Sequence, residues 1–321
     1  MKTVFAHLEM MRPYTAFYVG LVGLAGASAS GSTDAGGYLL SWLIPTSAWI
    51  AGLYGGDFID RELDAQSKPH RPIPSGRVSA RTALAIMISI IVVAASLSVW
   101  RNPWTLAVVG VATLLGVSYN KVFKRRGLSG HLVRGSLTAA VFAYGVMVAN
   151  APFSWWIAAG ACAFWLQDAA SNLVGAVRDI DGDRAGGYQT VPVRYGIAVS
   201  SKVAGGLSVG SLLIAGIALW HRAGVDVAVL IIPFALWILA LRRIPTSAGA
   251  DRFRADALAA HEILVLERLF LAAAFVIGGM GWIVGTALLA VSVSVSRFAQ
   301  RTMRARYEFG ADPMTVDRGR R

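Results

Sequence analysis

Long apolar segments recur along the whole chain, and they constrain its fold more than any other feature. Eight have roughly the length of a membrane-spanning helix, at about 13–30, 37–55, 82–100, 103–118, 132–149, 153–176, 199–220 and 224–241, and a ninth covers about 261–296. The chain is 55% hydrophobic and only 15% charged, whereas soluble domains carry about 25% charged residues. The sequence therefore predicts an all-α polytopic membrane protein.

The last apolar stretch is too long for one span at about 1.5 Å per residue. It contains Gly-Gly-Met-Gly at 278–281, and four arginines follow it. Two crossings give ten spans with these arginines on the cytoplasmic side, and one crossing gives nine with the tail outside. We expect about nine transmembrane helices around a central cavity, with an additional C-terminal helix. This transmembrane domain covers 1–296, and a basic tail covers 297–321.

Basic residues are concentrated in alternate linkers. The linkers after the second, fourth, sixth and eighth segments hold eighteen Lys and Arg, against two in the others. This positive-inside pattern puts the basic linkers in the cytoplasm, so the net charge of +12 does not predict nucleic-acid binding. No cleavable signal peptide is evident, and the Ala, Gly and Arg content fits a GC-rich bacterial genome. We expect a multi-pass protein of the bacterial cell (inner) membrane. The single cysteine, Cys162, excludes an internal disulfide framework.

The linker after the second segment carries an acidic motif, GGDFIDRELDAQSKPHRPIPSG at 55–76. Asp57, Asp60 and Asp64 are spaced i, i+3 and i+7, so on a helix they share one face. A solvated helix end would also hold several acids. However, a proline-rich loop follows, and it holds Lys68 and Arg71 beside the acids. Carboxylates mixed with cations at the mouth of a membrane cavity favour a site for phosphate and metal.

A second acidic motif, RDIDGDRAGGYQTVPVRYG, follows the sixth segment at 178–196, with Asp179 and Asp183 at i and i+4. The two motifs are four spans apart, which predicts two similar four-helix halves with the active cavity between them. Two facing carboxylate clusters can hold Mg²⁺ ions, which in turn hold a pyrophosphate.

These motifs carry a resemblance to a known family. The run from Gly56 to Gly76 resembles the first signature, N-D-x-x-D-x-x-x-D, of the UbiA-type intramembrane prenyltransferase superfamily (4-hydroxybenzoate polyprenyltransferase-like). Residues 172–196 resemble its second signature, and Tyr-Asn-Lys-Val-Phe-Lys-Arg at 119–125 is similar to its Tyr-Lys-Arg loop. The resemblance covers about residues 10 to 290, with the three motifs in the expected order.

The resemblance implies a role for each matching residue. Asp60 and Asp64 are the expected ligands of one Mg²⁺, and Asp179 and Asp183 of the other. Asp57 is expected to support them, as an additional metal ligand or by orienting the other carboxylates. Tyr119 lies near the diphosphate or stabilises positive charge on the allylic carbon. The residues expected to bind the diphosphate, directly or by supporting its site, are Lys68, Arg71, Lys124, Arg125, Arg178 and Asn172. One residue departs from the family: Gly56 replaces the first Asn of the signature.

The implied reaction is Mg²⁺-dependent transfer of an isoprenyl group from an allylic prenyl diphosphate to a small-molecule acceptor, with release of pyrophosphate. The expected acceptor is aromatic. Two alternatives stay open: a membrane terpene cyclase of the same superfamily, and a non-enzymatic transporter or lipid-binding protein.

Several intramembrane polar residues have no place in the motifs. Asp168, beside Gln167, faces either the cavity or a neighbouring helix. His261, Glu262, Glu267 and Arg268 form an interfacial salt-bridge network in preference to an acceptor site.

Overall fold

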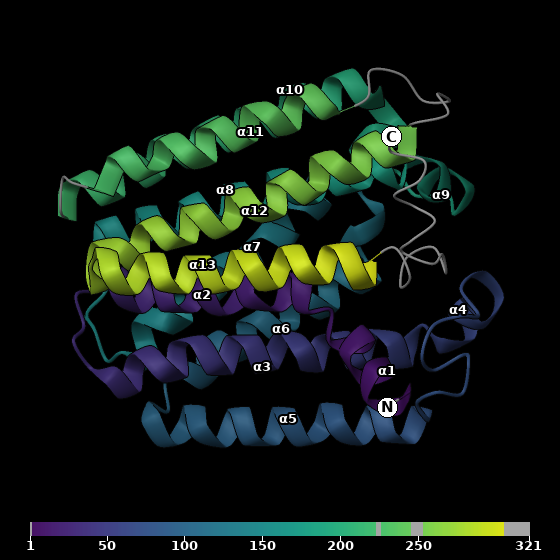
Figure 1. The fold of residues 1–321 in the computed structure, drawn as a ribbon, viewed down its shortest axis with the longest axis horizontal. Helices are drawn as coiled ribbons and strands as arrows, with labels where there is room; N and C mark the ends of the chain where they lie inside the picture. The colour runs from purple at the N-terminus through teal and green to yellow at the C-terminus, as the bar shows by residue number, and fades with distance from the viewer. Residues whose placement is uncertain (1, 223–225, 245–252, 305–321) are drawn as a thin grey trace.

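The computed structural model describes residues 2–222, 226–244 and 253–304, and over these ranges the chain is a bundle of long helices lying side by side (Figure 1). Ten of the described helices have 13 or more residues. They are α2 (Pro13–Ala29), α3 (Ala35–Ile59), α5 (Ala80–Arg101), α6 (Thr105–Lys121), α7 (Gly127–Val148), α8 (Trp155–Arg178), α10 (Val191–Arg222), α11 (Ile231–Arg243), α12 (Phe253–Met280) and α13 (Trp282–Ala299). The shorter elements are α1 (Lys2–Met11), α4 (Arg61–Ser67), α9 (Ile180–Ala185), η1 (Phe123–Arg125), η2 (Asp226–Leu230) and η3 (Gln300–Arg304).

The long helices confirm the all-α membrane fold. Each of the first eight apolar segments corresponds to one helix, and the ninth divides into α12 and α13 at Gly281, where φ is 83°. A positive φ of this size suits glycine, which has no Cβ to clash. The division favours two crossings of the last stretch. Five helices in the described ranges are by themselves long and apolar enough to span a membrane; they lie at Ala80–Arg101, Gly127–Val148, Val191–His221, Ala255–Met280 and Trp282–Met303.

The helix order repeats as the acidic motifs predict. In the first half, α3 ends at the first motif and the short helix α4 follows; in the second, α8 ends at the second motif and α9 follows. The residue between the two helices is an aspartate both times: Asp60 (φ −83°, ψ 1°) and Asp179 (φ −95°, ψ 8°). Both short helices lie at the same end of the bundle (Figure 1). The two acidic motifs therefore lie in the same local backbone arrangement, once in each half.

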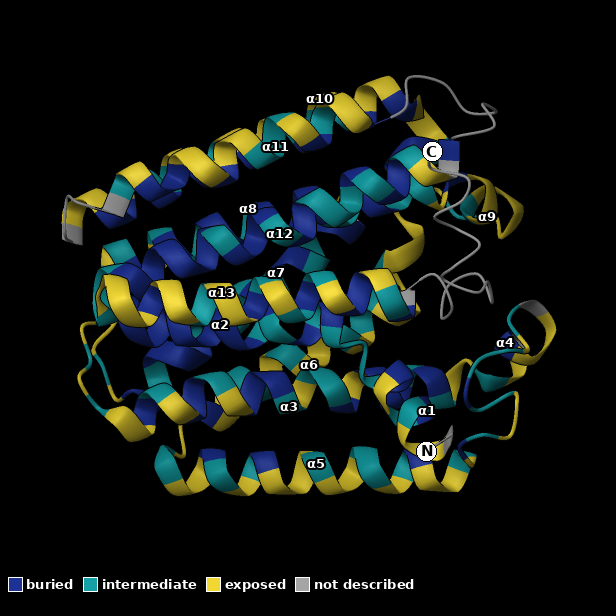
Figure 2. Ribbon diagram, in the orientation of Figure 1, coloured by how far each residue is buried: buried dark blue, intermediate teal, exposed yellow. Residues whose placement is uncertain are grey.

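Small residues bring the central helices together. A Cβ on Gly145 of α7 would lie 1.9 Å from the carbonyl oxygen of Gly23 in α2, and one on Gly26 would lie 2.0 Å from that of Phe142. Only glycine permits this approach, which is typical of helix packing in membranes. The peripheral helices turn apolar residues outward instead (Figure 2), as α5 does with Ile91 and Val92. These outward faces suit contact with lipid.

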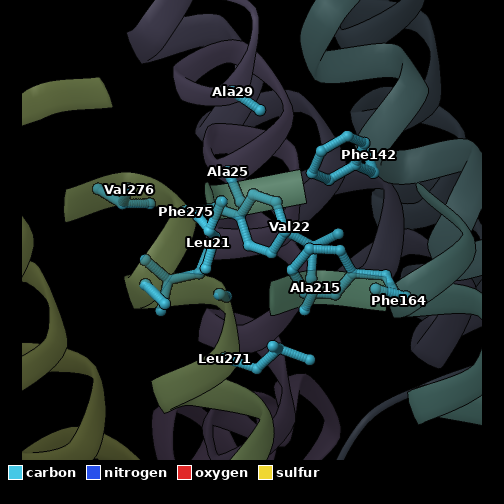
Figure 3. Close-up of a cluster of buried hydrophobic side chains, with 14 of the residues drawn as sticks. Leu21, Val22, Ala25, Ala29, Phe142, Phe164, Ala215, Leu271, Phe275 and Val276 are labelled. Atoms are coloured by element: carbon cyan, nitrogen blue, oxygen red, sulfur yellow. The ribbon is translucent and has the colours of Figure 1, made fainter. Parts of the chain in front are cut away.

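Aromatic side chains fill the bundle on the side away from the motifs. Phe142, Phe164 and Phe275 pack against one another with ring centroids 5.3–5.7 Å apart (Figure 3). Phe142 and Phe164 are completely buried, and Phe275 is 3% exposed. Phe142 lies one helical turn beyond Thr138, which lines a cavity. The aromatic cluster therefore closes the interior at this depth and leaves open space towards the motif end.

Candidate active site

The second acidic motif forms one wall of a pocket of about 160 Å³ at the motif end of the bundle. Asp179 and Asp183 line it together with Arg178, which follows from the predicted spacing. Tyr119, in the last turn of α6, and Lys124, in η1 just after that helix, also line the pocket. The structure thus brings two of the three sequence motifs into one site.

Backbone hydrogen bonds tie these two motifs together. Gln189 donates from its backbone nitrogen to the carbonyl oxygen of Arg125 (2.9 Å), and Gly127 donates to the carbonyl of Gln189 (2.7 Å). Gly130 lets α7 begin close to this loop, because a Cβ there would lie 2.3 Å from the carbonyl oxygen of Phe123. Lys124 is consequently held opposite the acidic motif by main-chain contacts.

The two carboxylates of the pocket differ in environment. Asp179 is exposed and pairs with Arg178 through two hydrogen bonds of 2.8 and 2.7 Å. Asp183 is half-buried, and this burial raises its pKa above the ordinary value; the Asp179 carboxylate raises it further. A hydrogen bond from Thr190 (3.1 Å) and the charges of Lys124 and Arg178 oppose the rise. Asp183 therefore binds a proton more readily than an ordinary aspartate, and a bound cation would displace that proton.

Of the other residues predicted to bind the diphosphate, Asn172 lies at the pocket and Arg125 does not. Asn172 lines the pocket and accepts a 2.7 Å hydrogen bond from His131 Nδ1, which fixes its amide. Arg125 is exposed and does not line this pocket; its guanidinium lies over the ring of Tyr188, 5.1 Å from the centroid. The role of Arg125 stays a prediction.

The first acidic motif lies at the same end of the bundle but does not line this pocket. The expectation of one shared helical face is wrong, because α3 ends at Ile59 and α4 begins only at Arg61. Asp57 and Asp64 are buried, while Asp60 at the break is exposed. Lys68 is half-buried in the following loop. The ligand and diphosphate roles of this motif remain predictions.

Two arginines neutralise the buried acids of the first motif. Arg71 Nη1 pairs with Asp64 Oδ2 at 2.7 Å, and Arg12 Nη2 pairs with Asp57 Oδ1 at 2.6 Å. Arg12 precedes α2 with φ 43°, a left-handed backbone that is uncommon outside glycine. The sequence does not predict its contact with Asp57, because nothing in it links two residues 45 positions apart.

A second cavity lies deeper between the helices and shares Asn172 and His261 with the first pocket. In its wall, Asp168 is bonded on both oxygens: Oδ2 to Arg134 Nη1 and Oδ1 to Arg268 Nη1, each at 2.9 Å. Both predicted alternatives for Asp168 are therefore correct, since it faces the cavity and also links helices. The expected salt-bridge network includes Arg268, and it extends to Arg134 of α7, which was not among its predicted members.

Arg134 could have been found from the sequence. It lies inside α7, an apolar helix long enough to span a membrane. An ionisable residue in such a helix marks a site by default. Behind the same wall, the side chain of Gln167 donates a short hydrogen bond to Glu267, which is fully buried.

The donor chemistry of the motifs fits Mg²⁺. Carboxylate oxygens suit this hard cation, which usually takes only one or two carboxylates and completes its shell with water and substrate phosphate. Asp179 and Asp183 in one pocket supply such a pair. Within the described ranges, no three His, Cys, Asp or Glu side chains are grouped to hold one ion, so a cage built from protein alone is not what these residues form.

Known proteins share both the sequence and the fold. Digeranylgeranylglyceryl phosphate synthase of Korarchaeum cryptofilum is 34% identical over 60% of this chain and 68% of its own length. The synthase of Natronomonas pharaonis is 33% identical over 66% of this chain and 77% of its own. A UbiA homologue from Aeropyrum pernix superposes with a TM-score of 0.67 at 16% identity, covering 82% of this chain and 97% of that one.

A UbiA homologue from Archaeoglobus fulgidus, solved with GPP and Mg²⁺, gives a TM-score of 0.62 at 18% identity and covers 84% of this chain and 99% of that one. At these identities the structures establish the fold. The UbiA prenyltransferase family itself matches residues 16–260. The motifs, the helix order and these matches agree: the chain is a prenyl-transferring enzyme and belongs to the UbiA prenyltransferase family.

Proposed function

We propose that the protein transfers an isoprenyl group from an allylic prenyl diphosphate to an acceptor within the membrane, with Mg²⁺ as cofactor and with release of pyrophosphate. The observation that carries this proposal is the shared pocket of Asp179, Asp183, Lys124 and Tyr119. It combines carboxylates for a metal, a cation for a diphosphate and an aromatic ring in one pocket at the motif end of the bundle. The Mg²⁺-bound homologue supports the choice of metal.

Asp179 and Asp183 would hold one Mg²⁺, and Asp60 and Asp64 the other. The metal neutralises the leaving diphosphate when it is bound. Lys124 and Arg178 bind diphosphate oxygens, and Asn172 is held in place for the same purpose by His131. The ring of Tyr119 faces the reacting carbon and stabilises positive charge on it. The helices around the cavity keep water from that charge.

The acceptor is proposed to be a glyceryl phosphate ether. The names of the two relatives, digeranylgeranylglyceryl phosphate synthases, support this class over the aromatic one expected from the motifs. Those names give no support to the terpene cyclase alternative. We place the catalytic domain at 1–296 and the basic tail at 297–321; α13 runs to Ala299, and residues 305–321 lie outside the described ranges.

We further propose that the active site faces the cytoplasm of a multi-pass cell-membrane protein. The first three basic linkers follow α3, α6 and α8. They lie at one end of the bundle, as the charge pattern predicts (Figure 1). The fourth linker includes 245–252, which fall outside the described residues. A bacterial source has no support from the comparisons, since the named relatives are archaeal.

The test uses purified protein in detergent with Mg²⁺ and geranylgeranyl diphosphate, with or without a glyceryl phosphate ether carrying one geranylgeranyl chain. Pyrophosphate release and the mass of the lipid product are followed. Release should require the acceptor, and Asp183→Asn should lower it about 100-fold or more. Asp181→Asn is the matched control, because Asp181 is exposed on the same short helix and lies outside the pocket.

Three results would contradict the proposal. Cyclic hydrocarbon products formed without acceptor would indicate a cyclase. Transfer to a phenol but never to the glyceryl ether would return the acceptor to the aromatic class. Equal release by Asp183→Asn and wild type would remove the second motif from the metal site.

A further inference from the structure

The deeper cavity, lined by Arg134, Asp168, Arg268, Tyr18 and Ser171 among others, has no role in the site described above. Asp168 lies ten residues before the end of α8, about 15 Å along the helix from the motif end. Buried charge at such depth in a membrane helix is costly unless it is paired or used. Pairing accounts for Asp168, whose two oxygens are both occupied.

Pairing does not account for the arginines. Arg134 uses only Nη1 for Asp168, and its Nε and Nη2 make no hydrogen bond within the described part of the chain. The Nε of Arg268 is buried without a partner there. Two guanidinium groups therefore keep donor N–H groups that one carboxylate cannot satisfy. The buried Nε of Arg268 costs free energy until an acceptor reaches it. The Arg134 side chain is 18% exposed and lines the cavity, so its remaining N–H groups are available to a ligand there.

Two hydroxyl groups on the same cavity wall are also unsatisfied. Tyr18 is 4% exposed and Ser171 is 1% exposed, and the Oη and Oγ atoms are buried with no partner in the described residues. Both residues line the cavity. Together with the arginines, they surround the space with hydrogen-bond donors, while the oxygens of Asp168 are already used.

Aromatic rings hold the two guanidinium groups in position. The Arg134 guanidinium lies over Trp49, 5.1 Å from the ring centroid, and the Arg268 guanidinium lies over Tyr18 at 4.5 Å. With the bonds to Asp168, each arginine is fixed on two sides. Glu267, behind the wall, is bonded by Gln167 and does not line the cavity. Fixed donors around a small cavity are preorganised for an anion with several oxygens.

We propose that this cavity is the binding site for the anionic headgroup of the acceptor, and that Arg134 is its principal ligand. The assignment rests on the proposed function. The cavity shares Asn172 and His261 with the diphosphate pocket, so an acceptor anchored here by its phosphate has its nucleophile beside the reacting carbon. Arg268 and Asp168 position Arg134, and the hydroxyls of Tyr18 and Ser171 donate to the remaining phosphate oxygens.

The experiment measures binding in the absence of Mg²⁺ and prenyl diphosphate, so that it is independent of turnover. Thermal unfolding of the detergent-solubilised protein is titrated with the geranylgeranyl glyceryl phosphate ether, with the same ether lacking phosphate, and with inorganic phosphate. Wild type should bind the phosphate ether about 10- to 100-fold more tightly than the neutral ether. Arg134→Gln should lose most of this difference; it leaves Asp168 paired with Arg268.

Tyr18→Phe provides a second test, because it removes only an unpartnered hydroxyl and leaves every ion pair intact. It should weaken binding of the phosphate ether about 3- to 10-fold and leave the neutral ether unchanged. If Arg134→Gln does not fold, Tyr18→Phe decides the question. Arg101→Gln is the control; Arg101 pairs with Asp34 and lies at the opposite end of α5 from the motifs.

Equal affinity of wild type for the two ethers overturns the proposal, and so does a preference that both variants retain. Tight binding of inorganic phosphate alone, with no gain from the ether, would make the cavity a site for a free anion instead of an acceptor. If the wild-type protein shows no prenyl transfer but still prefers the phosphate ether to the neutral ether, the proposed function is wrong and the anion site is retained.

Discussion

Replacing Asp168 with Asn tests the charge balance of the bundle interior. The side chain of Asp168 is 2% exposed, and it is bonded at 2.9 Å to each of Arg134 and Arg268. Asparagine keeps the volume but leaves two guanidinium groups without their counterion. Removing one partner of a buried ion pair typically costs about 3–5 kcal/mol. For a domain of this size or slightly smaller, that corresponds to a fall in Tm of roughly 10 °C.

The assay is thermal unfolding in detergent, followed by tryptophan fluorescence and by the fraction that remains monodisperse after heating. A double variant makes the test more specific. Asp168→Asn combined with Arg134→Gln removes one of the two arginine charges that Asp168→Asn alone leaves uncompensated. The double variant should therefore lose less than the sum of the two single variants, since residues in one ion-pair network couple. A Tm of Asp168→Asn within 2 °C of wild type, or strictly additive effects, would refute the reasoning.

Three further predictions concern the motifs and the packing. Thr190→Val removes a bond that lowers the pKa of Asp183, so the acid limb of the kcat/KM profile with Mg²⁺ should move to higher pH; an unmoved limb would contradict this. Gly145→Ala should lower stability by roughly 1–3 kcal/mol, while Gly110→Ala, whose Cβ meets nothing within 4 Å, should not; equal Tm values would contradict the packing argument. A Cβ at Gly56 also meets nothing within 4 Å, so Gly56→Asn should leave Tm unchanged and lower the Mg²⁺ concentration for half-maximal activity, which a metal titration checks.

The sequence predicts the helices well because a helix that crosses the hydrocarbon core of a membrane must be a continuous run of apolar residues. The length of the last segment and its Gly-Gly-Met-Gly run predict the split at Gly281. They do not predict which helices α13 packs against. The acidic motifs predict where the site lies for a similar reason, since they follow the same helix in each half. Local pattern is sufficient for these features.

The partners of the buried charges could not be predicted. Asp168 and Arg268 are 100 positions apart, and Arg12 and Asp57 are 45 apart. Which charged groups meet depends on how three or four helices pack, and periodicity within one helix carries no information about that. Helical spacing also does not predict the break at Asp60, which leaves Asp60 exposed while Asp57 and Asp64 on either side of it are buried.

The Arg134–Asp168–Arg268 cluster has a consequence for membrane insertion. A charged residue at the centre of a helix adds about 2.5–3.5 kcal/mol to its insertion free energy. Arg134 in α7 gains its counterion as soon as α8 has been synthesised, so these two helices are expected to enter the bilayer as a hairpin. Arg268 arrives 100 residues after Asp168, which leaves Asp168 Oδ1 without its partner until α12 enters. Truncation before α12 should therefore yield a chain that inserts but is recognised by membrane quality control, whereas truncation after α7 should impair insertion itself.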